Sequence, residues 1–545
     1  MTKPLLSVRN LRVNFTTPSG DFEAVKGVSF DVAPGETVAI VGESGSGKST
    51  IASSINRLLA ANGRVSDGKI FFEDREVTAI SERDMRTLRG AGIGLVPQDP
   101  MSNLNPVHTV GAQVAEALQV HGRAGTDKGR ARTLELLATV GIPDPENRIN
   151  QYPHEFSGGM RQRALIAIGL ACDPRLLIAD EPTSALDVTV QRRILDRLGE
   201  LTAESGTAVV LITHDLALAA ERADRVLVMY RGELVEEGPA REILERPHHE
   251  YTRRLVAAVP SFASETLVPN KSRGNTEGLS ERPEPIAVIE NVGRSYKLRG
   301  TARGTEFWAA RNVSFSIDRG RTTAIVGESG SGKSTTAKIL LGLETASEGT
   351  VSVGGKDLSK LRGKDLLAIR RQVQPVFQNP FASLDPRYTI AESVTEPLHV
   401  HKVGDRRTRN SRVIELLDHV ALPSVLAERY PHELSGGQRQ RVAIARALAL
   451  EPELVVLDEA VSALDVLVQA QILELLVQLQ HDLGLSYLFI SHDLAVVNML
   501  AHEVHVMKDG RIVESGTPQQ IFTTPQDPYT QELLAAIPGS SIAEG

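Results

Sequence analysis

The sequence contains one stretch of ten residues twice, VGESGSGKST at Val41–Thr50 and at Val326–Thr335. Both copies fit G-x-x-x-x-G-K-[ST], and each follows a short apolar run and precedes a helical pattern. Glycines let successive backbone N–H groups point at an anion, and the N-terminus of the following helix adds the positive end of its dipole. We therefore predict two sites for nucleotide phosphates. Their residues are Gly42, Ser44, Gly45, Gly47, Lys48, Ser49 and Thr50 in the first copy and Gly327, Ser329, Gly330, Gly332, Lys333, Ser334 and Thr335 in the second.

Each copy also has an apolar run that ends in two adjacent carboxylates, LLIADE and VVLDE. The first acid of each pair, at the end of a predicted strand, is expected beside the phosphates, where it holds Mg²⁺ with the loop hydroxyl. The predicted Mg²⁺ ligands from these elements are Ser49, Asp180, Ser334 and Asp458. The second acids, Glu181 and Glu459, are placed to orient and polarise an attacking water, although either could instead only cap the following turn. The pattern predicts a nucleotide site that transfers a phosphoryl group to water.

The repeat extends along most of the chain. HEFSGGMRQR (154–163), ADEPTSALDV (179–188) and THDLA (213–217) return as HELSGGQRQR, LDEAVSALDV and SHDLA, each 278 residues later (432 − 154, 457 − 179 and 491 − 213). We predict two units at residues 1–260 and 286–538, with a tail over 539–545. Residues 261–285, rich in Ser, Gly, Pro and charge, predict a flexible linker.

Within each unit, short apolar runs alternate with helical patterns. Continuous apolar runs bounded by turns are typical of strands buried on both faces of a parallel sheet, and the intervening helices indicate βαβ crossovers. The runs are ETVAIV, RLLIAD and AVVLIT in the first unit and TTAIVG, ELVVLD and SYLFIS in the second. Both units close with a hairpin pattern, RVLVMYRGELVEEG and EVHVMKDGRIVESG. The predicted fold class is α/β.

The composition narrows the classes of function. Of the 545 residues, 41% are apolar and 23% are charged, as in ordinary globular proteins, and the net charge of −8 argues against nucleic acid as the main partner. The single cysteine, Cys172, excludes an internal disulfide and any cysteine-ligated zinc or iron–sulfur site. No run approaches the ~20 apolar residues that span a bilayer, so a role at a membrane requires other chains.

Taken together, SGG before a basic helix, the apolar Asp-Glu strand, SALD and a strand that ends in His resemble the nucleotide-binding subunit of ABC transporters over nearly all of both halves. The resemblance implies that each unit is a P-loop domain with a mostly parallel sheet, a β subdomain and a helical subdomain. It also implies that the two units pair head to tail as an intramolecular pseudo-dimer. Each ATP would be held by the loop of one unit and covered by the SGG segment of the other. These covering residues are Ser157, Gly158 and Gly159 in the first unit and Ser435, Gly436, Gly437 and Gln438 in the second.

Four further residues take roles from the same resemblance. Gln98 and Gln378 match the glutamine that senses the γ-phosphate and Mg²⁺ and touches the membrane partner. His214 and His492 match the switch histidine that contacts the γ-phosphate.

Other positions match the family less directly. Asp187 and Asp465 match the segment that links the two sites. Phe15 and Tyr296 resemble the aromatic residue that stacks on adenine, although an aromatic residue there is as readily part of the core. One departure is Met160, which stands where the second unit has a glutamine and cannot form that residue's hydrogen bonds. We expect two hydrolytic sites, of which the one that uses Ser157–Met160 lacks this hydrogen bond.

Further sequence details resemble one subgroup of this family. FSGGM followed by LSGGQ, with PHHEYTRRLVAAVP and PQDPYTQELLAAIP after the two cores, resembles the oligopeptide/dipeptide/nickel importers with their two ATPase subunits fused. This implies two membrane-spanning permease subunits, an extracytoplasmic substrate-binding protein and a peripheral place on the cytoplasmic face of the membrane. Peptides are the first substrate class, with nickel, glutathione or another small solute as alternatives. Many members add a cysteine-rich tail that binds an iron–sulfur cluster; this chain lacks those cysteines, so no cluster is expected. The alternative is a soluble tandem ATPase acting on ribosomes, but such proteins carry a long charged helical arm between their units, and residues 261–285 are short.

Overall fold

The computed structural model describes residues 3–17, 20–123, 126–183, 186–259, 267, 284–297, 306–379, 383–462 and 464–537. The predicted tail and most of the predicted linker lie outside these residues. Leu267, within the predicted linker, donates its backbone N–H to the carbonyl of Met499 at 3.1 Å and packs against the core of the second unit.

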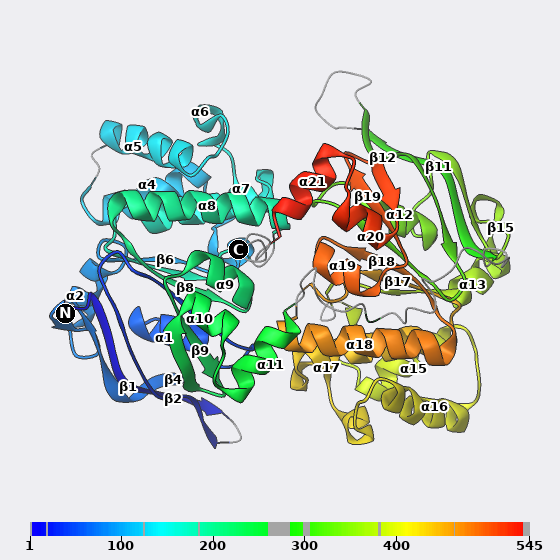
Figure 1. The fold of residues 1–545 in the computed structure, drawn as a ribbon, viewed down its shortest axis with the longest axis horizontal. Helices are drawn as coiled ribbons and strands as arrows, with labels where there is room; N and C mark the ends of the chain where they lie inside the picture. The colour runs from blue at the N-terminus through cyan, green and yellow to red at the C-terminus, as the bar shows by residue number, and fades with distance from the viewer. Residues whose placement is uncertain are drawn as a thin grey trace.

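A six-stranded sheet forms the centre of each unit, and the two units stand side by side (Figure 1). The strand orders, β10-β9-β3-β8-β7-β6 and β20-β19-β13-β18-β17-β16, are equivalent. All neighbours are parallel except the terminal hairpins, as the sequence predicts. In the first unit the strands are β3 (Thr37–Val41), β6 (Ile93–Val96), β7 (Leu176–Asp180), β8 (Ala208–Thr213), β9 (Arg225–Tyr230) and β10 (Glu233–Pro239). In the second they are β13 (Thr322–Val326), β16 (Val373–Val376), β17 (Leu454–Asp458), β18 (Ser486–Ser491), β19 (Glu503–Lys508) and β20 (Arg511–Gly516).

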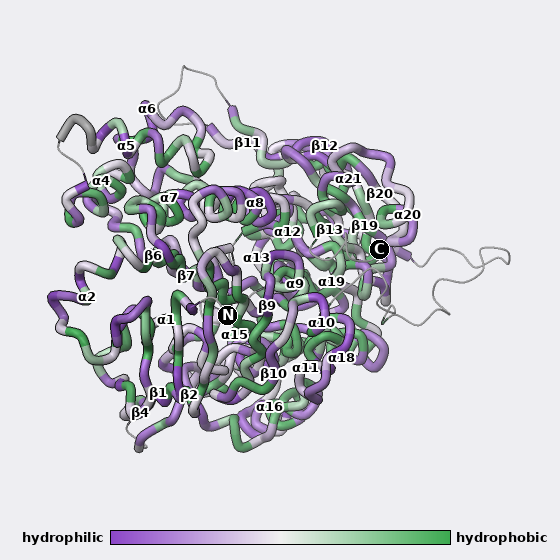
Figure 2. The backbone as a smooth tube through the Cα atoms, turned by 60° about the vertical axis from the view of Figure 1, so that its left-hand side comes forward, coloured by the Kyte–Doolittle hydropathy of each residue, from purple (hydrophilic) through white to green (hydrophobic). Residues whose placement is uncertain are grey.

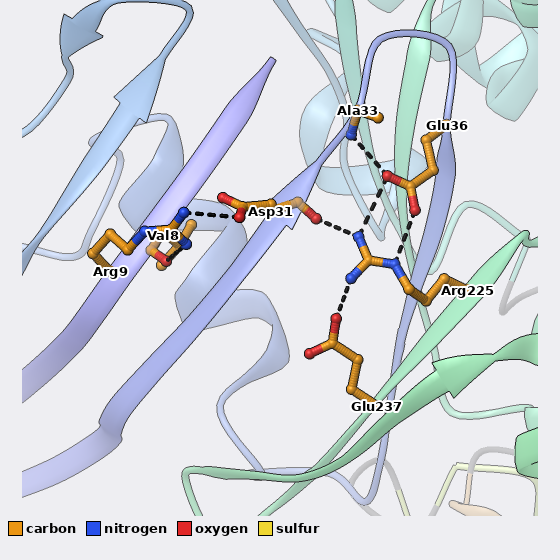
Figure 3. Close-up of polar contacts among 7 residues, drawn as sticks. All are labelled: Val8, Arg9, Asp31, Ala33, Glu36, Arg225 and Glu237. Carbon is orange, nitrogen blue, oxygen red and sulfur yellow. Dashed lines mark hydrogen bonds and ion pairs between the residues drawn. The ribbon is translucent and has the colours of Figure 1, made fainter. Parts of the chain in front are cut away.

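A smaller antiparallel sheet lies beside each large one, in the orders β2-β1-β4-β5 and β12-β11-β14-β15. Its strands are β1 (Leu6–Thr17), β2 (Gly20–Val32), β4 (Gly63–Phe72) and β5 (Arg75–Glu76), then β11 (Pro285–Lys297), β12 (Glu306–Asp318), β14 (Glu348–Val353) and β15 (Lys356–Asp357). In the first unit, Arg225 at the start of β9 ties the two sheets together. Its guanidinium donates to the carboxylates of Glu36 (2.9 Å) and Glu237 and to the carbonyl of Asp31 on β2 (Figure 3).

Helices cover the large sheets and form a separate helical part in each unit. The first unit has α1 (Lys48–Ile55), α2 (Glu82–Leu88), α3 (Pro100–Asn103), α4 (Val110–Val120), α5 (Thr126–Thr139), α6 (Pro145–Arg148), α7 (Gly158–Leu170), α8 (Val188–Ser205), α9 (Leu216–Arg222), α10 (Ala240–Glu245) and α11 (Glu250–Ala258). The second has α12 (Lys333–Leu340), α13 (Gly363–Gln372), α15 (Ile390–Val400), α16 (Arg406–His419), α17 (Gly436–Leu448), α18 (Val466–Leu483), α19 (Leu494–Leu500), α20 (Pro518–Thr523) and α21 (Pro528–Ala535).

The long helices α8 and α18 show how local sequence sets the helix bounds. The side chains of Asp187 and Asp465 cap their N-termini by accepting backbone N–H groups. Gly206 and Gly484 end them in the left-handed conformation, at φ 66° and 65°. The same acids stand at the contact between the units.

The two units contact each other through these helices and through the last helix of each unit. α11 of the first unit lies against α18 of the second, and α21 of the second lies against α8 of the first (Figure 1). Val466 and Leu467, at the start of α18, belong to the buried apolar cluster of the first unit. The contact therefore joins apolar cores as well as surfaces.

Apolar residues concentrate on the strands and on the inner faces of the helices. Hydropathy alternates along the outer helices, in line with one face packed on a sheet (Figure 2). All six residues of β8 and of β18 are buried, which confirms that these apolar runs are strands covered on both faces. Among the described helices, none is both long and apolar enough to cross a membrane.

Candidate functional site: two nucleotide sites

Each phosphate loop joins a central strand to a helix. In the first unit β3 ends at Val41 and α1 begins at Lys48. Gly42 has a φ of +146°, and a Cβ built there would lie 2.2 Å from the carbonyl oxygen of Met229, so only glycine fits this close approach. The second loop repeats this at Gly327, with the same distance to the carbonyl of Met507.

The lysine of each loop is buried inside the loop itself. Lys48 is 5% exposed, and its Nζ donates to the carbonyls of Gly42 (2.7 Å) and Glu43 (2.8 Å). Lys333 has the same two bonds, to Gly327 and Glu328. A buried ammonium at a helix N-terminus fits a polyphosphate, since it adds charge to an array of amides that already favours anions.

An acid at the end of the neighbouring strand meets the loop hydroxyl in both units. Ser49 Oγ donates to Asp180 Oδ1 at 3.0 Å, and Ser334 Oγ to Asp458 Oδ1 at 3.2 Å. Burial raises the pKa of both aspartates. A hydroxyl and a buried carboxylate that converge on one point form a set of hard oxygen donors that fits Mg²⁺.

The second acid of each pair lies at the centre of a polar cluster. Gln98 Nε2 donates to Glu181 Oε2 at 2.7 Å, and His214 Nδ1 lies 3.4 Å from Glu181 Oε1. Burial raises the pKa of Glu181, but His214, Lys48 and Gln98 outweigh burial and hold that pKa below its ordinary value. Burial lowers the pKa of His214, yet the carboxylates of Glu181 and Asp215 leave it raised. A charged carboxylate can therefore face a protonated imidazole here.

The second unit has the same cluster. Gln378 Nε2 donates to Glu459 Oε2 at 2.7 Å, and His492 Nδ1 lies 3.4 Å from the same oxygen. Both catalytic candidates have left-handed backbones, with φ of 44° at Glu181 and 49° at Glu459. Non-glycine residues in this region are strained, and such strain gathers at functional sites.

A cavity of about 560 Å³ lies over the second phosphate loop. This volume is in the range of small-molecule sites. It is lined from the second unit by Tyr296, Phe307, Ala309, Ser329, Gly330, Gly332, Lys333, Ser334, Thr335, Gln378, Glu459, Ser462 and His492, and from the first unit by Leu186 and Asp187. We call the region around this loop the second nucleotide site and its counterpart around Lys48 the first nucleotide site.

Each site contacts the opposite unit through the segment that follows the acidic pair. Asp187 Oδ2 accepts the backbone N–H of Ser329 at 3.4 Å, and Thr189 contacts the carboxylate of Glu328. In the other direction, Asp465 of the second unit lies near Lys48 of the first. Burial lowers the pKa of Lys48, and the Asp465 carboxylate is one of the charges that oppose this shift. The units are thus arranged head to tail. A smaller cavity, about 140 Å³, lies between the two acid–histidine clusters and is lined by both His214 and His492.

Each SGG segment stands at the N-terminus of a helix. Ser157 and Ser435 cap α7 and α17, and Gln438 completes a capping box by accepting the N–H of Ser435 at 3.0 Å. Met160 has no oxygen with which to form the equivalent bond. Of the first unit's described residues, Leu186 and Asp187 line the second-site cavity, whereas Ser157, Gly158 and Gly159 do not. The structure therefore brings together the phosphate loop and Asp187, but leaves the SGG segment outside the cavity.

The aromatic candidates also differ between the units. Tyr296 lines the second-site cavity, with the Arg294 guanidinium 4.8 Å from its ring centre. Its neighbour across the strand pair, Phe307, lines the same cavity and is 50% exposed; the sequence reasoning missed it. Phe15 is half-buried against the first unit's core, opposite the exposed Phe22. The signal available in the sequence was a second aromatic residue shortly after the first in each unit, Phe22 after Phe15 and Phe307 after Tyr296.

Two family models match the chain. The model described as ABC transporter matches residues 25–184 and 310–462, and that described as oligopeptide/dipeptide transporter, C-terminal region, matches residues 235–287 and 513–543. Glutathione import ATP-binding protein GsiA of Pectobacterium atrosepticum is 45% identical over 559 residues, which cover 98% of this chain and 90% of that protein. GsiA of Escherichia coli (strain K12) is 45% identical over 558 residues, with 98% and 89% covered.

Solved structures include a dimeric post-hydrolysis state of the ATP-binding cassette MJ0796 bound to ADP and Pi. It is 33% identical, covers 43% of this chain and 98% of that chain, and has a TM-score of 0.39. Both units are covered by the ABC model, and the relatives are matched almost from end to end. The chain belongs to the ABC transporter family, as an ATP-hydrolysing import subunit in which two ATPase units follow one another.

Proposed function

We propose that this chain lies on the cytoplasmic face of the membrane and powers uptake of a peptide-like solute. The solute passes through two separate permease subunits, to which an extracytoplasmic binding protein delivers it. The observation that carries this proposal is the head-to-tail contact in which Asp187 reaches the loop residue Ser329. Because each loop faces the other unit, ATP binding and release can change the contact between the units. This change in the contact is the movement that the permease subunits would sense.

Within each site, the loop residues bind the phosphates and the acids direct hydrolysis. Lys48 and Lys333 neutralise the β- and γ-phosphates. Glu181 and Glu459 hold the attacking water, and His214 and His492 keep those carboxylates charged and oriented. Mg²⁺, held by Ser49, Asp180 and the Gln98 amide oxygen and by Ser334, Asp458 and the Gln378 amide oxygen, supplies charge neutralisation of the phosphates when bound.

The opposite unit closes each site. Ser157-Gly158-Gly159 would cover the second site and Ser435-Gly436-Gly437 the first, since each begins a helix and offers backbone N–H groups to an anion. The cavity that these segments do not yet line is consistent with two units that still have to approach each other. Tyr296 with Phe307, and Phe15 at the first site, would stack on adenine.

The two relatives are glutathione import proteins, which favours glutathione, itself a modified tripeptide, as the solute. The test is uptake of labelled glutathione, a dipeptide and Ni²⁺ by cells that carry or lack the gene for this chain. Loss of glutathione or dipeptide uptake alone supports the proposal. Unchanged uptake of both, or co-purification of the tagged chain with ribosomal proteins instead of permeases, would contradict it.

A further inference from the structure

Each end segment places a tyrosine on its own phosphate loop. The backbone N–H of Glu43 donates to the Tyr251 hydroxyl at 3.0 Å, and the N–H of Glu328 donates to the Tyr529 hydroxyl at 3.0 Å. Both tyrosines are buried, at 3% and 4% exposed. They lie on α11 and α21, outside the span of the ABC transporter model.

The residue held by the tyrosine also holds the loop lysine. The carbonyl of Glu43 accepts Lys48 Nζ, and the carbonyl of Glu328 accepts Lys333 Nζ, both at 2.8 Å. The hydroxyl and the ammonium thus fix the same residue from its two backbone ends. A loop amide without this acceptor would have to find another partner, because backbone groups removed from water are costly to leave unpaired.

The helices that carry the tyrosines are anchored firmly to the terminal hairpins. The carboxylate of Glu236 accepts the N–H groups of His248 (2.7 Å) and His249 (3.0 Å) just before α11. Glu514 does the same for Gln526 (2.8 Å) and Asp527 (3.2 Å) before α21. The tyrosine position is therefore set by the sheet rather than by a free helix.

The ring of each tyrosine has a fixed neighbour as well. Tyr230 stacks on Tyr251 with ring centres 4.2 Å apart, and Lys508 Nζ lies 4.5 Å from the ring centre of Tyr529. Both neighbours end the strand beside the phosphate loop, and both helices also lie against the opposite unit.

We propose that Tyr251 and Tyr529 are positioning residues of the two phosphate loops: their hydroxyls hold the second loop residue, Glu43 or Glu328, so that the loop lysine and amides are already arranged for ATP. The tyrosines do not touch the nucleotide. They act through Glu43 and Glu328, and the proposal rests on ATP being bound at these loops.

The test removes only the two oxygen atoms. In the full chain, Tyr251→Phe with Tyr529→Phe should weaken Mg·ATP binding about fivefold, equivalent to the roughly 1 kcal/mol of one neutral hydrogen bond, and change kcat less than about twofold. The matched control is Tyr487→Phe, which removes another buried tyrosine hydroxyl, bonded to the carbonyl of Leu476 at 2.9 Å and outside both nucleotide sites. It should lower the melting temperature and leave ATP affinity unchanged.

Hydrogen exchange gives a second readout that does not depend on activity. Without nucleotide, the amides of Glu43 and Glu328 should exchange faster in the double variant than in the parent chain. If the double variant folds poorly, the two single variants replace it, and each should speed exchange only in its own loop. Parent-like ATP affinity and parent-like exchange would overturn the proposal, as would an equal loss of affinity in Tyr487→Phe. A parent chain that does not bind Mg·ATP would refute the proposed function itself.

Discussion

Removal of one hydroxyl at the contact between the units should distinguish the two nucleotide sites. Thr189, 3% exposed at the start of α8, contacts the carboxylate of Glu328 in the second phosphate loop and the Asp187 carboxylate at 3.0 Å. The equivalent residue of α18, 278 positions later, is Leu467, which has no hydroxyl. Thr189→Val keeps the shape of the side chain and removes only its polar contact.

A hydrogen bond to a charged group contributes about 1.5–3 kcal/mol. The lower end applies because the Glu328 side chain is only half-buried, so about 1.5 kcal/mol, or roughly a tenfold change in affinity, is expected. ATP affinity changes only by the part of this contact that the ATP-bound form makes more strongly than the free form, so about tenfold is the upper limit of the loss, and it should appear at the second site only.

The assay is calorimetric titration with Mg·ATP in a chain that also carries Glu181→Gln and Glu459→Gln, so that hydrolysis does not interfere. Two affinities, up to about tenfold apart, are expected after Thr189→Val. The control is Thr202→Val, since Thr202 is a buried threonine of the same helix that bonds to the carbonyl of Leu198 at 2.9 Å. Parent-like affinity at both sites in Thr189→Val, or an equal effect of Thr202→Val, would refute the reasoning.

Three further results are expected. Glu181→Gln with Glu459→Gln should keep ATP binding and reduce turnover at least about 100-fold, the usual weight of a general base, and undiminished phosphate release would dismiss the two acids as catalytic. The His214→Gln/His492→Gln variant should differ most from the parent in unfolding free energy between pH 4.5 and 6.5. In this range both partners of the ion pair contribute fully to stability, because the Glu181 contribution is lost only as pH falls through its lowered pKa and the His214 contribution only as pH rises through its raised pKa. Urea unfolding across pH checks this, and a difference in unfolding free energy that grows at alkaline pH would contradict it. Arg225→Leu should lower the free energy of unfolding in urea by about 2 kcal/mol, because it leaves Glu36 and Glu237 without their cation. The control Arg64→Leu, which breaks an exposed pair with Asp21, should lower it by less than about 1 kcal/mol, and equal losses would contradict the bridging role of Arg225.

The sequence was sufficient for the architecture because the signals were local and repeated. The apolar runs became β3, β7 and β8 and their counterparts, and the Gly-rich loops led into helices as predicted. The hairpin at Asp509–Gly510 has both residues at positive φ, as such a turn requires.

What the sequence could not provide depended on contacts between distant segments. No local pattern places Tyr251 beside Glu43, because they meet through the fold across 208 positions. The SGG segments carried a strong signal for an anion, but their distance from the opposite loop is set by how closely the two units approach, which no local pattern encodes. Phe307 was overlooked because its place in the cavity follows from its pairing with Tyr296 across two strands.

The most direct measurement asks which SGG segment serves which loop. Lys333→Ala in the full chain should leave only the first nucleotide site able to bind Mg·ATP. Into this background either Ser435→Arg or Ser157→Arg is added. Head-to-tail sites predict that Ser435→Arg abolishes the remaining binding and Ser157→Arg leaves it intact. Loss of binding with Ser157→Arg and retention with Ser435→Arg would show that each unit owns a complete site, and would contradict the shared arrangement.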